Sequence, residues 1–412
     1  MTSEWCMSTY PDRIVIIGAG PVGLVLSLAL AQADQKVCLV EALGDDNFLE
    51  QVPRAGTNHP ATLEMLDRVG LYPKLEPRGI IAPVFHYWDR HEGKLIAEFD
   101  HAYLKDDTRF PYVLQCERIK IVEEALKMVK AHPNIDLRLR TEFVSFEQDA
   151  DGVTAHVKNP AGEEETITGR YLVSGEGARS IVRRDLDIPF EGFTYDDRTL
   201  NIEVAYDFRQ HGYAHRNYIS DPNEWSNLFH WSGPPDRWRV HFPTDPNEDE
   251  TTLMQPEALQ ARMQGFLPTG KPFNIVGSNL YVVHQRVAQK FRDGRAILAG
   301  DSAHVNSPIG AMGMNSGIHD AINLADKFIA MARKEADDGV LDRYARQRRH
   351  VAIAHTQAQT IRNKKLLAEK DPAVRQRNHD ELRRAADDPV LARKFLLRTA
   401  LFDSLREAEA IV

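Results

Sequence analysis

Three glycines near the N-terminus have the spacing of a phosphate-binding loop. Gly18, Gly20 and Gly23 form a G-x-G-x-x-G pattern within "IVIIGAGPVGLVLSLALAQA". In such a loop the first glycine permits a tight turn, the second lets backbone approach a pyrophosphate, and the third lets helix and strand pack closely. A helix that begins there offers free N–H groups and its positive dipole end to phosphates. The pattern predicts dinucleotide binding, with FAD and NAD as open alternatives.

A second stretch, "GDSAHVNSPIGAMGMNSGIHDA" from Gly300 to Ala321, has the composition of a ligand-binding loop. Asp301 follows an apolar strand, where its carboxylate is suited to bind a sugar-alcohol hydroxyl. Backbone N–H groups at the helix start, Met312 to Asn315, would face an anionic or polarisable ring edge. His304 is read as a packed polar residue at least as readily as a catalytic one.

Both stretches need an α/β framework to hold them. A strand over 14–17, an apolar helix after Gly20 and a strand over 36–40 that ends at Glu41 form the βαβ unit that the glycine pattern requires. Glu41 is placed to accept hydrogen bonds from an adenosine ribose. A strand over 296–299 and a helix from about Gly313, with apolar residues at helical spacing, frame the second stretch.

These segments together resemble the single-component FAD-dependent aromatic hydroxylases of the para-hydroxybenzoate hydroxylase and phenol hydroxylase superfamily. The second stretch is similar to their second FAD fingerprint, and the matching residues are Asp301, Pro308, Gly310, Gly313 and Asn315. The resemblance implies that the aspartate binds the ribityl chain and that the helix start faces the flavin pyrimidine edge. Ala311 and Met312 depart from the pattern, because a Gly-Gln pair is commoner there.

Three further segments match the same family. "YLVSGEGARSIVRRDL" resembles its third motif, which serves FAD and NAD(P)H, although Glu176 stands where aspartate is expected. Arg54 matches an arginine beside the cofactor phosphates, and Gln115 and Arg118 match residues that approach the FAD ribose and pyrophosphate. The resemblance thus implies a cofactor-binding set of Gly18, Gly20, Gly23, Glu41, Arg54, Gln115, Arg118, Glu176, Asp301, Gly313, Met314 and Asn315.

The expected fold is a Rossmann-like FAD-binding domain of the para-hydroxybenzoate hydroxylase type, interrupted by a mixed-sheet substrate domain and followed by a helical C-terminal segment. The FAD-binding domain takes residues 1–75, 110–186 and 283–340. The substrate domain takes 76–109 and 187–282, which are rich in Trp, Tyr and His. Residues 341–412 form the C-terminal helices.

Substrate contacts are less defined by the sequence than cofactor contacts. Arg237, Arg239 and His241 would share one face of a strand, because its side chains alternate with a period of two. An ungapped comparison puts Gly233 where para-hydroxybenzoate hydroxylase has its carboxylate-binding arginine, which argues against para-hydroxybenzoate as substrate. Candidates for the substrate pocket are Tyr218, His230, Arg239, His241 and Pro308. For the first four, a packed or exposed residue of the sheet is the alternative. The catalytic base is not identified.

Composition excludes several other classes of protein. The 412-residue chain carries a formal net charge of −9, which argues against nucleic acid as a partner. Its three cysteines form no metal-binding pattern and fit a reducing compartment, so we expect a cytoplasmic protein without a metal. The uncharged stretch over 14–33 is interrupted by Gly-Ala-Gly-Pro, which favours a buried strand and helix over a membrane span. A homodimer stays open.

The resemblance implies a monooxygenase with bound FAD, transient NADPH or NADH, and a small aromatic substrate and O₂ as partners. Hydroxylation of a phenolic or hydroxylated heteroaromatic ring would proceed through a C4a-hydroperoxyflavin. One alternative keeps the scaffold and performs epoxidation or the hydroxylation of a quinone or polyketide. More distant alternatives are an NAD-binding dehydrogenase and a non-catalytic sensor. No WxWxIP signature of the halogenase branch occurs.

Overall fold

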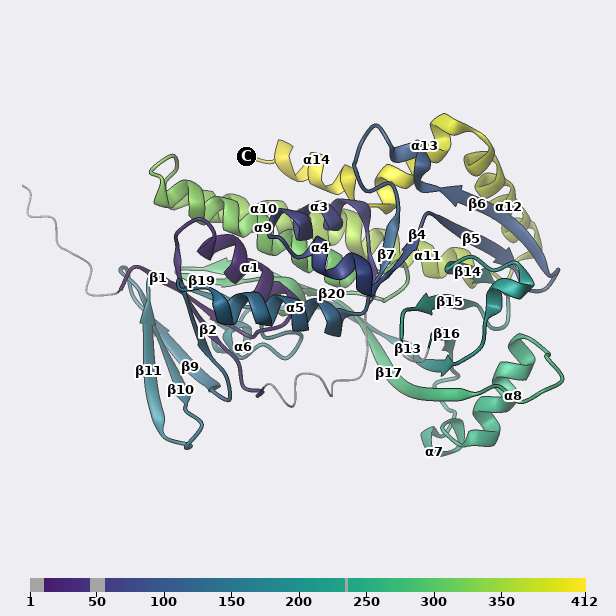
Figure 1. The fold of residues 1–412 in the computed structure, drawn as a ribbon, viewed down its shortest axis with the longest axis horizontal. Coiled ribbons are helices and arrows are strands. Elements are labelled where there is room, and N and C mark those ends of the chain that lie inside the picture. The colour runs from purple at the N-terminus through teal and green to yellow at the C-terminus, as the bar shows by residue number, and fades with distance from the viewer. Residues whose placement is uncertain (1–10, 45–55, 234–235) are drawn as a thin grey trace, which may run out of the picture.

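The computed structural model describes residues 11–44, 56–233 and 236–412 (Figure 1). It contains the expected α/β fold, with a mostly parallel sheet, a larger mixed sheet and a helical C-terminal segment. Among the described residues, no helix combines the length and the apolar character that crossing a bilayer requires.

The first sheet has six strands and carries both glycine-rich stretches. Its central strands are short and apolar, so they are buried on both faces, as parallel strands flanked by helices generally are. All its pairings are parallel except β18 with β19. Its order is β18 (Arg292–Asp293), β19 (Ala296–Leu298), β12 (Tyr171–Ser174), β1 (Arg13–Ile17), β2 (Lys36–Val40) and β8 (Ile135–Arg138).

Helices on the flanks of this sheet complete the apolar core. The helix α1 (Pro21–Ala31) packs against α5 (Arg118–Ala131) and α9 (Met312–Ala332), which come from distant parts of the chain. Smaller helices in this part of the chain are α3 (Pro60–Arg68), α4 (Tyr72–Leu75) and α6 (Ile181–Asp185). Since α1 is almost wholly buried, its uncharged sequence is explained by burial in the protein.

Two three-stranded sheets flank the six-stranded sheet. One is antiparallel and projects from one end of the molecule (Figure 1); its strands are β9 (Glu142–Gln148), β10 (Val153–Lys158) and β11 (Glu164–Gly169). The other joins β3 (Thr57–Asn58), β7 (Val113–Gln115) and β4 (Ile80–Ala82).

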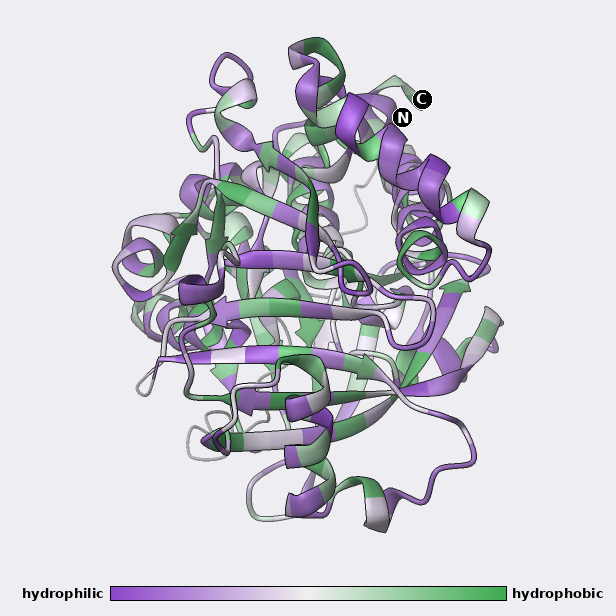
Figure 2. Cartoon of the chain, turned by 90° about the vertical axis from the view of Figure 1, so that its right-hand side faces the viewer, coloured by the Kyte–Doolittle hydropathy of each residue, from purple (hydrophilic) through white to green (hydrophobic). Residues whose placement is uncertain are grey.

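The eight-stranded sheet is mixed, because β14 pairs with β5 in parallel while its other pairings are antiparallel. Its order is β20 (His304–Val305), β17 (Ile275–Ala288), β13 (Phe190–Val204), β16 (Arg237–Pro243), β15 (Ser226–Trp231), β14 (Arg216–Ser220), β5 (Val84–Asp89) and β6 (Lys94–Asp100). Figure 2 shows hydrophilic and hydrophobic residues alternating along several strands. The outer face packs on α8 (Pro256–Phe266) through Trp238, Val240 and Phe242, beside the short α7 (Glu250–Leu253).

The C-terminal helices run back across both parts of the molecule (Figure 1). They are α10 (Gly339–Val351), α11 (Ala358–Leu367), α12 (Pro372–Asp387), α13 (Pro389–Thr399) and α14 (Phe402–Ala410), and a π-helical turn over Ala352–Gln357 joins the first two. The helix α10 packs on α9, whereas α12 and α13 pack on the edge strand β6 of the eight-stranded sheet.

Candidate flavin and substrate site

The three glycine-rich segments meet at the carboxyl ends of β1, β12 and β19. A Cβ atom added to Gly18 would lie 2.5 Å from the Gly175 carbonyl oxygen, and one added to Gly300 would lie 2.8 Å from Val22 Cγ2. The Gly177 N–H donates to Ser302 Oγ at 3.1 Å. Segments more than a hundred residues apart in sequence therefore form one continuous cradle.

Within the first loop the three glycines have different surroundings. Gly18 has φ +98°, in the left-handed region that favours glycine. A Cβ on Gly23 would lie 2.0 Å from the Gly18 carbonyl oxygen, so this glycine permits the close packing of loop and helix. A Cβ on Gly20 would meet no atom within 4 Å. Among the described residues, no neighbouring atom makes a glycine necessary at position 20, and open space lies beside it.

This space lies at the start of a helix that has no side-chain cap. Gly20 is the N-cap of α1, no side chain accepts a hydrogen bond from its first turn, and Pro21 follows. The free N–H groups of such a turn are satisfied by water or by a ligand, and they suit a phosphate because the helix dipole adds positive potential. Open space in front of an uncapped helix start fits a pyrophosphate.

Glu41 lies directly after β2, and its carboxylate holds the loop. One oxygen accepts a hydrogen bond from the Ala19 N–H at 2.7 Å and the other from the Leu43 N–H at 2.9 Å. A carboxylate has about four lone-pair positions. Glu41 thus retains acceptor capacity for the ribose hydroxyls that the sequence assigns to it.

The second fingerprint places its residues around the start of α9. Asp301 is exposed just beyond β19, whose last residue is Leu298 rather than Ala299. Asn315 is buried and accepts a hydrogen bond from the His59 N–H at 2.9 Å, while its amide donates to Thr57 O at 2.8 Å. Gly313 and Met314 are half-buried in the first turn. Asn315 therefore ties this helix start to the segment before α3.

The departure of Ala311 from the family pattern has a structural consequence. Ala311 is the N-cap of α9 and has φ +58° and ψ +38°, a left-handed conformation. That conformation costs a non-glycine residue roughly 1–2 kcal/mol. The commoner glycine would adopt this conformation without that cost.

The remaining cofactor candidates differ in their surroundings. Gln115 is buried and accepts a hydrogen bond from Thr57 Oγ1, while its Nε2 has no partner among the described residues. Arg118 opens α5. Glu176 accepts four hydrogen bonds from Ser174, Ser180 and the N–H groups that start α6. Its carboxylate thus serves the protein itself, and cofactor binding by Glu176 stays a prediction. Arg54 lies outside the described residues.

A buried charged group supports the cradle from behind. Asp320 of α9 accepts hydrogen bonds from the Gly300 N–H at 2.9 Å and from Arg348 Nε at 2.5 Å, and His304 Nε2 lies 2.8 Å away. Burial disfavours its ionisation, but Arg348 and His304 outweigh burial and lower the pKa of Asp320 to about 2. His304 is thus placed beside a buried structural carboxylate.

The face of the eight-stranded sheet toward the second fingerprint, here called the inner face, carries a polar row. Adjacent strands place Tyr218 beside Asn227, Asn227 beside His241, and His241 beside Asn201. Aromatic rings of this face share one hydrophobic cluster with Ile309 and Met312 of the fingerprint. The row therefore faces the fingerprint loop.

The inner face contains buried polar atoms that no described residue satisfies. They are Asn227 Oδ1, His241 Nδ1, Asn201 Oδ1 and Arg216 Nε. Buried polar groups in folded proteins are almost always hydrogen-bonded, and an orphaned one calls for an explanation. Four orphans on neighbouring strands indicate a surface that is completed by a polar ligand or by water.

The substrate candidates from the sequence are only partly brought together. Tyr218, Arg239 and His241 lie on the inner face, and Arg237, Arg239 and His241 share it as the period of two predicts. Pro308 lies in the loop opposite and accepts a turn hydrogen bond from the Ala311 N–H. His230 lies on the outer face, where its ring stacks on Trp238 at 4.4 Å, so it is separated from the other candidates.

Comparison with known proteins gives the same assignment as this geometry. The family described as FAD binding domain matches residues 12–359. The chain is 34% identical to para-nitrophenol 4-monooxygenase from Pseudomonas sp. (strain WBC-3) over 389 residues, which cover 94% of each protein. This chain is a member of the FAD-binding aromatic monooxygenase family.

Further relatives agree with this membership. This chain is 29% identical over 347 residues to 6-hydroxy-3-succinoylpyridine 3-monooxygenase HspB of Pseudomonas putida (strain DSM 28022 / S16), and the match covers 83% of this chain and 85% of that protein. The crystal structure of p-nitrophenol 4-monooxygenase PnpA from Pseudomonas putida DLL-E4 superposes with a TM-score of 0.89 at 33% identity, over 96% and 98% of the two chains. OxyS anhydrotetracycline hydroxylase from Streptomyces rimosus gives 0.76 at 26% identity, over 95% and 76%.

The structure places on the inner face a buried arginine that the sequence analysis missed. Arg216 is 3% exposed and has no acidic partner among the described residues. Its Nη2 donates to Tyr218 Oη at 2.7 Å, and its guanidinium lies over the Phe85 ring at 5.0 Å. The alternation of the strand-like segment over 216–220 was the available signal, because it puts Arg216 on the face of Tyr218.

Proposed function

We propose that this monooxygenase hydroxylates a small aromatic ring that carries an anionic group, a phenolate or a carboxylate, with NADPH or NADH as transient reductant and O₂ as oxidant. One oxygen atom enters the ring and the other leaves as water. The observation that carries the anionic preference is Arg216, a buried guanidinium without a carboxylate partner in the described chain.

The charge of Arg216 requires compensation. An arginine side chain does not lose its proton in a protein, and a buried charge without a partner is costly. The pKa of His59 is lowered well below its ordinary value by burial and then by the charge of Arg216, so His59 adds no charge. An anionic substrate group beside Arg216 would complete the pair, and its ring would contact the aromatic side chains of the inner face.

His241 supplies a neutral polar group to the same surface. Burial, followed by the positive charge of Arg239, lowers the pKa of His241 to about 3. The imidazole is therefore neutral at neutral pH, and its unpartnered Nδ1 is available to a ring hydroxyl. We assign His241 the orientation of that hydroxyl, with Asn227 beside it as a second acceptor.

The cofactor site fits FAD on three observations: the open space at Gly20, the uncapped start of α1 and the unpartnered Gln115 Nε2. When bound, FAD would supply the redox chemistry: it would take electrons from the nicotinamide and transfer an oxygen atom to the substrate. The chain's own residues bind the pyrophosphate at α1, the ribose at Glu41 and the substrate on the inner face. The packed rings around Ile309 and Met312 exclude water from the space between them.

The same division organises the chain. We propose that the six-stranded sheet with its helices binds the cofactor, in the ranges 1–75, 110–186 and 283–340. The eight-stranded sheet, mostly from 76–109 and 187–282, would bind the substrate. The C-terminal helices over 341–412 would close both parts.

The test is substrate-dependent oxidation of NADPH or NADH with product analysis across a panel. The panel contains 4-nitrophenol, hydroxypyridine carboxylates and hydroxybenzoates as anions. The neutral counterparts are the methyl ether of 4-nitrophenol and, for each carboxylate, the methyl ester of its methyl ether. We expect hydroxylated product from at least one anion and none from its neutral counterpart. Hydroxylation of the neutral rings at equal rates would contradict the anionic preference.

Arg216→Gln sharpens this test. Loss of a charge-assisted hydrogen bond costs about 1.5–3 kcal/mol, so KM for the anionic substrate should rise roughly ten- to a hundred-fold. Arg209→Gln is the matched control, because Arg209 is exposed and paired with Asp207. An unchanged KM in the Arg216→Gln variant would remove Arg216 from the substrate site.

A further inference from the structure

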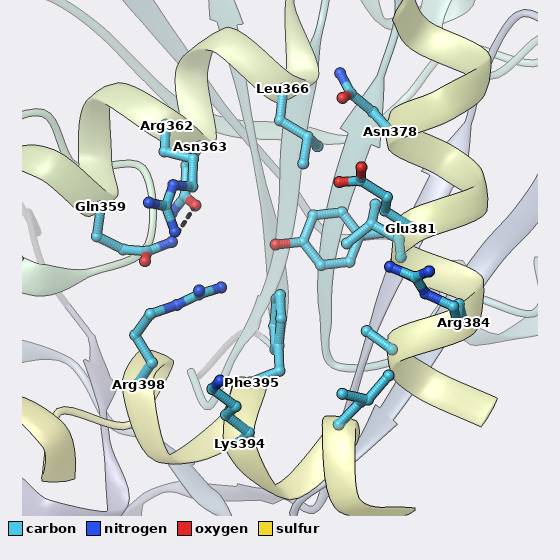
Figure 3. A pocket seen from close by; sticks show the side chains of 14 residues that line it. Gln359, Arg362, Asn363, Leu366, Asn378, Glu381, Arg384, Lys394, Phe395 and Arg398 are labelled. Carbon is cyan, nitrogen blue, oxygen red and sulfur yellow. Dashed lines mark hydrogen bonds between the residues drawn. The ribbon is translucent and has the colours of Figure 1, made fainter. Parts of the chain in front are cut away.

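A separate cavity lies among the C-terminal helices. It has a volume of about 370 Å³ and lies between α11, α12 and α13 (Figure 3). Pockets of roughly 300–1,000 Å³ commonly hold small molecules. Its apolar walls include Tyr87, Phe395, Leu366 and Leu382, so a ligand there would contact aromatic and aliphatic side chains.

The polar lining of this cavity is strongly cationic. Arg362, Arg384, Lys394 and Arg398 line it together with a single carboxylate, Glu381. Arg384 and Arg398 reach into it from facing helices (Figure 3). Within the described chain, none of the four cationic groups has an ion pair or a hydrogen bond. Arg362, Arg384 and Lys394 are exposed, so water solvates their charges, whereas Arg398 is half-buried.

Among the four cationic groups, Arg398 is the one whose charge is least exposed to water. It is half-buried, and its Nε is fully buried without a hydrogen-bond partner among the described residues. Burial lowers the pKa of Arg398, and the nearby charge of Arg362 lowers it further. Because a guanidinium stays protonated, its proximity to Arg362 is relieved by an anion and not by loss of a proton.

We propose that this cavity binds an aromatic carboxylate, with the carboxylate on Arg398 and Arg362 and the ring against Tyr87 and Phe395. The planar fork of a guanidinium matches the two oxygens of a carboxylate. The aromatic walls select a ring over a small inorganic anion. The cavity is a second site, distinct from the substrate surface, and does not rest on the proposed function.

The cavity is connected to the substrate surface through one pair of rings. Tyr87 of the cavity stacks on Tyr218 of the inner face, with ring centroids 5.2 Å apart. Tyr218 in turn accepts the hydrogen bond from Arg216. A ligand against Tyr87 therefore contacts the layer of rings whose other side carries the substrate site.

The test uses FAD-saturated protein titrated with sodium benzoate, followed at once by calorimetry and by the visible absorbance of the flavin. Benzoate beside the flavin alters its absorbance, whereas benzoate in the cavity gives heat alone. We expect Arg398→Gln to weaken the event that is silent in the flavin absorbance at least about ten-fold. Arg393→Gln, on the same helix but paired with Asp107, should leave it unchanged, and neutral benzamide should not produce it.

The two proposals fail separately. Arg216→Gln should remove only the benzoate binding that changes the flavin absorbance. If benzoate causes no such absorbance change in the wild type, only the anionic preference of the catalytic site is contradicted. Heat that follows the flavin absorbance throughout, or heat that Arg398→Gln leaves unchanged, overturns the cavity site. Crystals soaked in 4-bromobenzoate give an independent answer in the wild-type protein: a bromine anomalous peak between α11 and α13 supports the site, and its absence at that position overturns it.

Discussion

The glycine-rich loops, proposed to bind the flavin, and the inner face of the eight-stranded sheet, proposed to bind the substrate, present different parts of the chain. The loops present backbone: an uncapped helix start, open space at Gly20, and a turn held by Glu41. The inner face presents side chains from five strands, several of them with unsatisfied polar atoms. In the proposed site, the loops would bind a dinucleotide by its shape, whereas the face would select a ligand by charge and by hydrogen bonding.

This difference predicts which substitutions lower stability and which lower ligand affinity. A backbone cradle depends on packing behind it, so changes at its support should cost stability. A side-chain surface already carries unsatisfied groups, so changes there should cost ligand affinity and little stability. Each of the variants below separates these two effects.

The largest effect is expected at the support of the cradle. Asp320→Asn removes the charge that pairs with buried Arg348, and breaking a buried ion pair by removing one partner costs about 3–5 kcal/mol. Asp326→Asn on the same helix is the control, because its pair with Arg68 is exposed and such pairs contribute about 0–1 kcal/mol. The free energy of unfolding of both variants, measured in urea, gives the comparison.

Asp320 also predicts the direction of a pH dependence. Its pKa is about 2 in the folded protein and about 3.9 in the unfolded chain. The stability it contributes is therefore fully present above about pH 4 and is lost as the pH falls from about 4 toward 2. The difference in unfolding free energy between wild type and Asp320→Asn should shrink over that window; a difference independent of pH would contradict the assignment.

A smaller effect, confined to the cofactor, is expected at Gly20. Gly20→Val places its branches in the space assigned to the pyrophosphate, and we expect FAD affinity to fall about a hundred-fold, roughly 2.7 kcal/mol. The apoprotein should unfold as the wild type does, because an added Cβ meets nothing there. Gly23→Val is the contrast, since its Cβ would clash with Gly18 and destabilise the apoprotein itself. Full flavin occupancy in Gly20→Val would mean that the loop is only a structural turn and does not bind the pyrophosphate.

The smallest effect is expected on the inner face. Tyr218→Phe removes the hydroxyl that accepts a hydrogen bond from Arg216 but keeps the ring. The substitution leaves the guanidinium of Arg216 in place and removes only a bond that orients it, so KM for an anionic substrate should rise roughly two- to twelve-fold, less than in Arg216→Gln. FAD affinity, measured by flavin fluorescence, should stay the same. A large loss of FAD instead would mean that the two surfaces are not separable.

The sequence predicts the loops better than the face for a physical reason. Gly18, Gly20 and Gly23 are close in sequence, and their spacing states directly what the backbone must do. Tyr218 and His230 are both polar residues in neighbouring strands, yet they lie on opposite faces. The period of two fixes the alternation within a strand, but only the pairing register fixes which neighbour lies beside it.

The same limit explains why Arg216 and Asn227 were missed. Neither belongs to a motif, and each gains its role from residues on other strands and from the absence of a partner, which no spacing displays. The support at Asp320 was missed likewise, because its partners Gly300 and Arg348 lie 20 and 28 residues away.

The insertion of β19 between β18 and β12 has a consequence for how the protein is made. The six strands of that sheet are synthesised from residue 13 to residue 298, so β1 leaves the ribosome long before the sheet can close. At about 5–20 residues per second, the delay between Ile17 and Leu298 is roughly 14–56 s. During that interval the uncharged segment over 14–33 has no finished core to enter. A nascent chain stalled before Leu298 therefore lacks β19, a strand of the six-stranded sheet.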